Sequence, residues 1–300
     1  MMQLYLANKP LIDFFLISVG FAYSQQIVFR AGVFSIATAG FAALGAYCTA
    51  IMVTRYGVPF FAAVACGTLL GGLAGLALSI PLARLRGAFQ AIATLAFVQI
   101  ILSLLLYGES FTGGALGILN IPRAVDTFTL MAAVAVTMYI SWSIGRTSLG
   151  RTFDALRQNE TVAASLGVSI GKYHGIAFIL SGAIGGLFGA LQSLYVFSIE
   201  PHDYGFHLIV AILTMVVLGG RTTLLGPLLG ALILTLIPEI ARPLAEYRPL
   251  VNGLILILVI IFLPWGVGDS IVHWFERRRR AASRARRPEA KEAPGAVTLR

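Results

Sequence analysis

The sequence predicts an all-α integral membrane protein, a polytopic bundle of about eight or nine transmembrane helices. Hydrophobic residues make up 58% of the 300 residues and charged residues only 12%, whereas charged residues form about a quarter of a typical soluble domain. Apolar runs of about 20 residues, enough to cross the bilayer core as a helix, recur along almost the whole chain. Because these runs are continuous, they exclude the alternating strands of a membrane β-barrel.

Apolar runs place nine helices along the chain, at residues 10–29, 33–52, 59–80, 88–107, 127–145, 175–198, 206–220, 223–240 and 249–268. The second run contains small and polar residues between Phe34 and Gly40, which leaves open whether it spans fully or forms a broken or re-entrant segment. Small residues at four-residue spacing predict close helix packing in the third, sixth and eighth runs, at Gly67, Gly71, Gly75, Gly182, Gly186, Ala190, Gly226 and Gly230.

Lys and Arg are distributed unequally between the alternate connections of this layout. One side receives 17 of the 22 basic residues, nine of them in the C-terminal tail, and the other side receives five. Because basic loops stay in the cytoplasm, this asymmetry places the N-terminus outside and the C-terminus in the cytoplasm. Residues 1–270 then form the transmembrane domain, with a cytoplasmic loop at 146–174.

The tail, residues 271–300, is basic and is predicted to be a disordered cytoplasmic segment. Its run Arg277-Arg278-Arg279-Arg280 could in principle bind nucleic acid. Directly after a helix, the run is better explained as a topology determinant that contacts anionic membrane lipid. We therefore expect no nucleic-acid partner.

The predicted helices lack the residue sets of catalysis or ion-driven transport. The charge closest to a helix interior is Asp13, near the start of the first run, so the buried relay of a proton-driven carrier is missing and energy is expected to enter from elsewhere. Residues 167–173 lack the spacing and the Ser or Thr of a phosphate-binding loop, so ATP would be hydrolysed on a partner. His202, Asp203 and His207 could converge on a metal, but a solvated loop is favoured because no ligand spacing is present. We expect no catalytic residue and no bound metal or cofactor.

The cytoplasmic loop at 146–174 is the most informative stretch. From Ser148 it reads as an amphipathic helix that stops at Gly167. Arg157 is spaced to pair with Asp154 and Glu160 at three-residue separation. The apolar residues Phe153 and Leu156, flanked by polar ones, suit either docking in a groove of a cytoplasmic protein or lying on the lipid surface.

This loop also carries a specific pattern, formed by Gly150, Arg151, Ala155, Arg157, Asn159, Glu160 and Gly167. Further patterns are Arg84–Gly87 with Ala91–Leu95, and Leu218–Gly220 with Leu225–Pro227. Together they resemble the permease subunits of branched-chain amino-acid ABC importers, and the longer of the two permeases in particular. The resemblance implies a multi-pass protein of the cell membrane, inner or plasma, which is not an enzyme and pairs with a second homologous permease. It also implies an extracytoplasmic substrate-binding protein and two cytoplasmic ATPase subunits that bind ATP and contact segment 148–167.

Polar side chains within apolar runs are candidates for the translocation path, because they are costly in lipid unless they meet water, solute or another helix. They are Ser35, Thr38, Gln90, Thr94 and Gln99. Taken singly, each side chain is explained as well by a hydrogen bond to a neighbouring helix; the path is predicted from the five as a group. Departures from the family pattern, at Gln99, Ala115, Thr222 and Trp265, leave the cargo open between branched-chain amino acids, another amino acid, and urea or a short amide.

Two other functions compete with an importer permease. A stand-alone secondary carrier or channel would transport its solute without any partner. An intramembrane enzyme would need a catalytic pair at membrane depth, and the sequence offers none.

Overall fold

The computed structural model describes residues 2–240, with side chains described from residue 9 to residue 236. The predicted ninth run at 249–268 and the tail at 271–300, with Arg277–Arg280, lie outside the described residues. Within these limits the chain is helical with short connections, as the sequence predicts.

Eight of the predicted apolar runs correspond to helices: α1 (Met2–Arg30), α2 (Thr38–Tyr56), α3 (Phe60–Leu82), α4 (Ala88–Tyr107), α6 (Thr127–Arg146), α9 (Ile170–Tyr195), α10 (Phe206–Gly219) and α11 (Gly226–Ile240). The shorter elements are α5 (Glu109–Thr112), η1 (Gly114–Leu116), α7 (Ser148–Gln158), α8 (Glu160–Ser165) and η2 (Pro201–Tyr204). In the described part, six stretches are long and apolar enough to cross a membrane; α2 is not among them, and α11 is shorter.

The second predicted run is helical only from its sixth residue onward. Residues 33–36 have no regular secondary structure, and α2 begins only at Thr38. This irregular backbone is held by side chains from other elements: the Ile36 amide donates to the Thr94 hydroxyl at 3.1 Å, and Gln25 donates to the Ser35 carbonyl. Buried backbone groups outside a helix need such partners, so α1 and α4 make this interruption possible.

Helices α3 and α9 meet through the small residues that the spacing predicts, and α2 joins them through Gly45, which the spacing did not single out. A Cβ added at Gly71 of α3 would collide with the carbonyl oxygen of Gly182 in α9. One added at Gly45 of α2 would collide with the carbonyl oxygen of Gly186, also in α9. The three backbones therefore touch directly, as in other tightly packed membrane helices.

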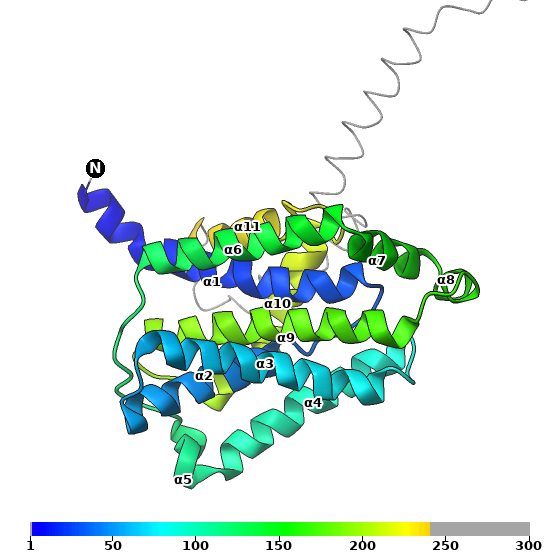
Figure 1. Cartoon of the computed structure of the whole chain (residues 1–300). Helices are drawn as coiled ribbons and strands as arrows, with labels where there is room; N and C mark the ends of the chain where they lie inside the picture. The colour runs from blue at the N-terminus through cyan, green and yellow to red at the C-terminus, as the bar shows by residue number, and fades with distance from the viewer. Residues whose placement is uncertain (1, 241–300) are drawn as a thin grey trace, which may run out of the picture.

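The long helices lie side by side, and their connections gather at two ends of the bundle (Figure 1). At one end lie α7 and α8, with the turn after α1 and the connection between α3 and α4. At the other end lie α5 and the connection that leads up to α6. Which of the two ends faces the cytoplasm stays a prediction from the charge asymmetry.

Two helices at the periphery expose large apolar side chains. Helix α6 packs against α1 and exposes Phe128 and Tyr139, while α4 leans away from the bundle and exposes Ile100 and Leu104 (Figure 1). In a bilayer such surfaces meet lipid or another membrane subunit, so their exposure is consistent with an integral membrane protein.

Candidate functional site

The loop singled out by the sequence forms two short helices, α7 and α8, rather than one. The break lies at Asn159, whose backbone is extended and whose side-chain oxygen accepts hydrogen bonds from the amides of Thr161 (3.0 Å) and Val162 (3.1 Å). Asn159 is therefore the N-cap of α8, and Glu160 follows at the helix start, where a carboxylate is favourable. The prediction of one continuous helix was wrong, because the cap restarts the helix.

The predicted stop at Gly167 is confirmed. Gly167 has φ +86°, in the left-handed region that favours glycine. Its amide donates to the Ala164 carbonyl at 3.0 Å, and the amide of Val168 donates to the Ala163 carbonyl at 3.1 Å. These bonds close the end of α8.

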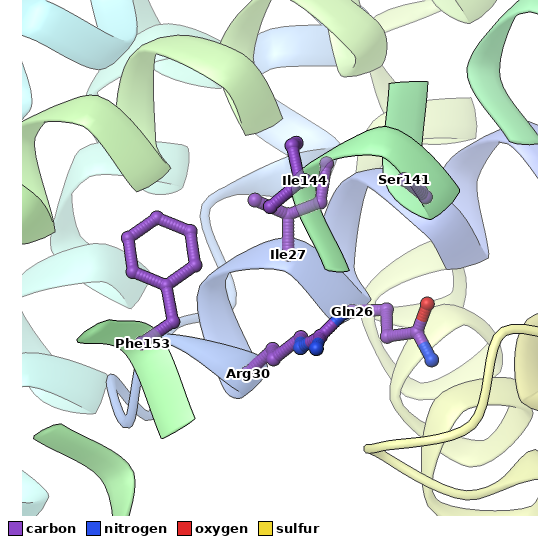
Figure 2. Close-up of a pocket in the computed structure, with 6 residues that line it drawn as sticks. All are labelled: Gln26, Ile27, Arg30, Ser141, Ile144 and Phe153. Carbon is purple, nitrogen blue, oxygen red and sulfur yellow. The ribbon is translucent and has the colours of Figure 1, made fainter. Parts of the chain in front are cut away.

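The apolar side of α7 faces into the protein. Phe153 is 0% exposed and Leu156 is 1% exposed. Figure 2 shows Phe153 beside a small cavity that Ile27 of α1 and Ile144 of α6 also line. Phe153 and Leu156 therefore pack inside the bundle, and neither alternative that the sequence left open for them, docking on a protein or lying on lipid, describes their place. A helical pattern cannot tell whether an apolar face meets its own bundle or a partner.

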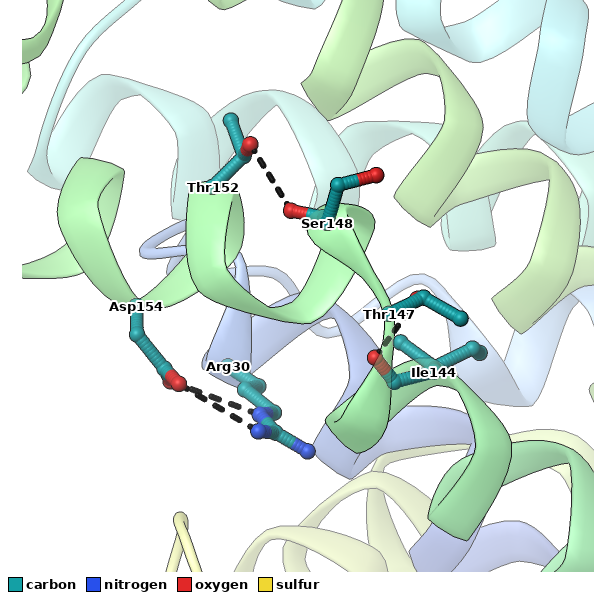
Figure 3. Close-up of polar contacts among 6 residues, drawn as sticks. All are labelled: Arg30, Ile144, Thr147, Ser148, Thr152 and Asp154. Atoms are coloured by element: carbon teal, nitrogen blue, oxygen red, sulfur yellow. Dashed lines mark hydrogen bonds and ion pairs between the residues drawn. The ribbon is translucent and has the colours of Figure 1, made fainter.

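The acidic residues of the segment bind charges from other elements, not from their own helix. Asp154 accepts two hydrogen bonds from Arg30 of α1, from Nε at 3.4 Å and from Nη2 at 3.3 Å (Figure 3). Glu160 pairs with Arg86, in the connection between α3 and α4, at 3.8 Å. Neither predicted pair with Arg157 lies within salt-bridge distance in the described part of the chain. The segment is thus tied to two separate parts of the bundle.

The outward surface of α7 and α8 combines basic and apolar side chains. Four residues of the predicted pattern are exposed there: Arg151, Ala155, Arg157 and Asn159. Val162 is 54% exposed and Leu166 is 79% exposed, and the sequence analysis did not single out either. Gly150, by contrast, faces inward, since a Cβ there would collide with the Ile144 carbonyl. We call the exposed set, Arg151, Ala155, Arg157, Val162 and Leu166, the outward face of the segment.

The five predicted path residues do not form one group. Ser35, Thr38 and Thr94 lie at the irregular segment before α2, where all three are buried. Gln90, also buried, donates to the Leu85 carbonyl at 2.9 Å, at the start of its own helix. Gln99 is exposed and lies apart from them.

A run of four polar residues in α1, Tyr23 to Gln26, was missed by the sequence analysis. Ser24 donates to the Ser181 carbonyl of α9 at 2.8 Å, and Gln26 donates to the Thr223 carbonyl at 2.7 Å. Gln25 accepts from the Thr38 hydroxyl at 2.7 Å. The signal was available, because four consecutive polar side chains in an apolar helix must find partners on several sides.

Gln99 lines an open cavity of about 340 Å³ near η2 and α10. Gln99, Ser103 and His202 supply its polar groups, and the rest of the lining is Leu102, Leu106, Pro201, Gly205 and Phe206. Small-molecule sites of proteins begin at about this size and combine apolar walls with a few polar groups. In the described part, no three His, Cys, Asp or Glu side chains gather as they would around a metal.

Comparison with known proteins agrees with the pattern in the loop. A family model described as the permease component of branched-chain amino acid transport systems matches residues 11–264. The chain is similar to the high-affinity branched-chain amino acid transport system permease protein LivM of Escherichia coli K12, with 30% identity over 275 residues, covering 80% of this chain and 65% of that protein. It is also 28% identical over 163 residues to LivH, another permease protein of that system in the same organism, covering 54% of this chain and 50% of LivH.

A more distant relative belongs to another transport system. The autoinducer 2 import system permease protein LsrC of Enterobacter sp. strain 638 is 28% identical over 211 residues, covering 66% of this chain and 61% of that protein. The chain spans slightly less than two thirds of the length of the LivM protein that it matches. No solved structure matches the chain significantly.

Proposed function

The chain belongs to the family of permease components of branched-chain amino acid transport systems, and we propose that it forms, with a second related permease, the membrane path of an ATP-driven importer. Two cytoplasmic ATPase subunits hydrolyse the ATP, and an extracytoplasmic binding protein delivers the solute. In this assignment α7 and α8 are the coupling segment on which an ATPase docks. The cargo is a branched-chain amino acid.

The observation that carries the proposal is that α7 and α8 have one side buried against the bundle and one side exposed. Phe153, Leu156 and the Arg30–Asp154 ion pair fix the inner side of this segment to the bundle. On its outward face, Arg157 and Leu166 are exposed to solvent. A helix that lies on lipid needs a free apolar side, and that side of α7 is already buried within the protein. Docking on a cytoplasmic protein is therefore the better explanation of the exposed side chains.

The path is proposed to follow the exposed side of α4. Gln99 and Ser103 stand there among exposed apolar residues such as Ile100 and Leu104. Polar side chains are unfavourable in lipid, so this side of α4 is better placed at a water-containing interface with the second permease. The other predicted path residues do not line this side of α4. They hold the irregular segment before α2 and the start of α4 in place; they are Ser35, Thr38, Gln90 and Thr94.

The cavity beside α4 supports the choice of cargo. Its apolar residues Leu102, Leu106 and Phe206 can contact an aliphatic side chain, while Gln99 and His202 can bind polar groups. Urea has no aliphatic part for the apolar walls. In uptake assays with labelled leucine, excess valine or isoleucine should compete and excess urea should not; competition by urea alone would identify the cargo as an amide.

Charge reversal on the coupling segment tests the function. Arg157→Glu reverses a charge on the outward face, and Glu160→Arg turns the ion pair with Arg86 into a repulsion that displaces α8. Each variant should abolish ATP-dependent leucine uptake and co-purification of the ATPases, while membrane insertion stays normal. The matched control is Thr152→Ala, which removes a hydroxyl that donates to the Ser148 carbonyl of its own helix (Figure 3). Normal uptake and normal ATPase binding in both reversal variants would refute the assignment.

A further inference from the structure

The last two turns of α1, residues 23–30, carry five polar side chains that reach four different parts of the protein. We infer that this stretch of α1 transmits movement of the coupling segment to the interior of the bundle. The inference rests on the proposed function, and it extends the coupling role from α7 and α8 to residues of α1. It assigns positioning roles to Tyr23, Ser24, Gln25, Gln26 and Arg30.

The first step is the firm attachment of α7 to α1. Arg30 holds Asp154 through two hydrogen bonds, and Phe153 is buried beside Ile27. Immediately after α1, Gly32 approaches the backbone of α7 so closely that a Cβ there would lie 3.0 Å from the Cα of Arg157. A displacement of α7 therefore displaces the end of α1 with it.

The second step runs from α1 into the bundle. Tyr23 and Gln26 donate to the carbonyls of Leu224 and Thr223, both at 2.7 Å, in the connection between α10 and α11. Gln25 bonds to Ser35 and Thr38, at the irregular segment before α2, and Ser24 bonds to Ser181 of α9. The four side chains are at most 4% exposed, so water cannot replace these partners when the helix moves.

Two other routes leave the coupling segment. The ion pair of Glu160 with Arg86 is weak, because the Arg86 side chain is largely exposed to solvent, and the route through α6 leads back to α1. α6 continues directly into α7, but it packs against α1 and exposes much of the rest of its surface, including Phe128, Met131 and Tyr139. A force that enters α6 therefore reaches the bundle through α1. The segment 33–36 is the element best suited to respond, because none of its residues belongs to a helix.

Uncoupling is the expected sign of a broken connection. In the complete transporter, reconstituted in proteoliposomes, Gln25→Met and the pair Arg30→Gln with Asp154→Asn should each lower leucine uptake per ATP hydrolysed roughly tenfold. Subunit assembly and the rate of ATP hydrolysis should stay within about twofold of the parent transporter. Thr137→Ala is the control, since this buried hydroxyl donates only one turn back, to the Ala133 carbonyl of α6.

A reversible cross-link separates transmission from a merely structural role. In a background with Cys48→Ala and Cys66→Ala, the pair Arg30→Cys with Asp154→Cys should be uncoupled at first. A short bifunctional methanethiosulfonate should then restore uptake per ATP to within about twofold of the parent, and a reductant should abolish it again. Restoration requires that α1 and α7 move as one unit.

Three results would overturn the inference. These are unchanged coupling in Gln25→Met and in the double variant, failure of the cross-link to restore uptake, and a further loss of uptake on cross-linking. In each case a parent transporter with normal ATP-dependent uptake leaves the proposed function intact. A parent transporter without such uptake would refute the proposed function itself.

Discussion

Asn159 illustrates how a single side chain decides local structure in the coupling segment. The pattern of Asn159 followed by Glu160 was found from the sequence, and the structure gives it a local physical role as the cap and first residue of α8. Capping can be read from a sequence, because Asn before an acidic residue is typical of a helix start. The ion pairs could not be predicted, because Asp154 reaches Arg30 across 124 positions of the chain.

Removing the cap should loosen α8 without unfolding the bundle. Asn159→Ala leaves the amides of Thr161 and Val162 without their acceptor and should cost about 1 kcal/mol, whereas Asn159→Asp keeps an acceptor and should be nearly neutral. Amide hydrogen exchange of residues 160–165 in the purified protein measures this difference. Equal exchange in the two variants would contradict the role of Asn159 as a cap.

Phe153 and Val162 should respond in opposite ways to truncation. Phe153→Ala removes a fully buried ring and should lower the free energy of unfolding by about 3–5 kcal/mol. Val162→Ala, on the exposed face, should change it by less than about 0.5 kcal/mol but weaken ATPase binding. Unfolding in detergent and ATPase co-purification measure the two effects. If Phe153→Ala kept the parental stability but lost ATPase binding, Phe153 would contact the ATPase and would not be buried in the bundle.

At the scale of elements, the sequence predicted the long helices well and the interrupted one only as a possibility. Continuous apolar runs fix where a helix can cross lipid, so α3, α4 and α6 begin and end within two residues of their predicted limits. The late start of α2 depends on Gln25 and Thr94, which belong to other helices. No local pattern in residues 33–37 contains those partners.

Two neighbouring glycines of α3 test the packing of α3 against α9. Gly71→Ala should destabilise the protein strongly, because the new Cβ would collide with the Gly182 carbonyl, which belongs to backbone and cannot rotate away. At Gly72 a new Cβ would meet Ala183 at an ordinary 3.6 Å, so Gly72→Ala should be tolerated. Thermal unfolding of the two purified variants gives the comparison. A Gly71→Ala variant as stable as Gly72→Ala would show that these backbones do not touch.

At the scale of the whole molecule, the charge asymmetry predicts an orientation that the arrangement of the helices supports but does not fix. In the described residues, Arg30, Arg86 and Arg157 gather at the end where α7 and α8 lie. At the same end of α6, Arg146 stacks over Trp142 at 4.2 Å, a pairing that suits the membrane interface. The boundary with the proposed second permease could not be predicted, because it depends on the sequence of another chain.

Single cysteines at the two ends should react from opposite sides of the membrane. In a background with Cys48→Ala and Cys66→Ala, Glu200→Cys should react with a membrane-impermeant maleimide in intact cells. Ser165→Cys, on α8, should react only after the cells are opened. Both positions are exposed in the structure. The reverse pattern would place the coupling segment outside the cell, where no ATPase can bind it.

The most direct test of the account is leucine uptake into proteoliposomes that hold either this chain alone or the complete transporter with its second permease, ATPases and binding protein. The account predicts that the chain alone moves no leucine, whereas the complete transporter accumulates it only when ATP is supplied on the side of α7 and α8. Leucine transport by the purified chain alone, with no ATPase present, would contradict the account.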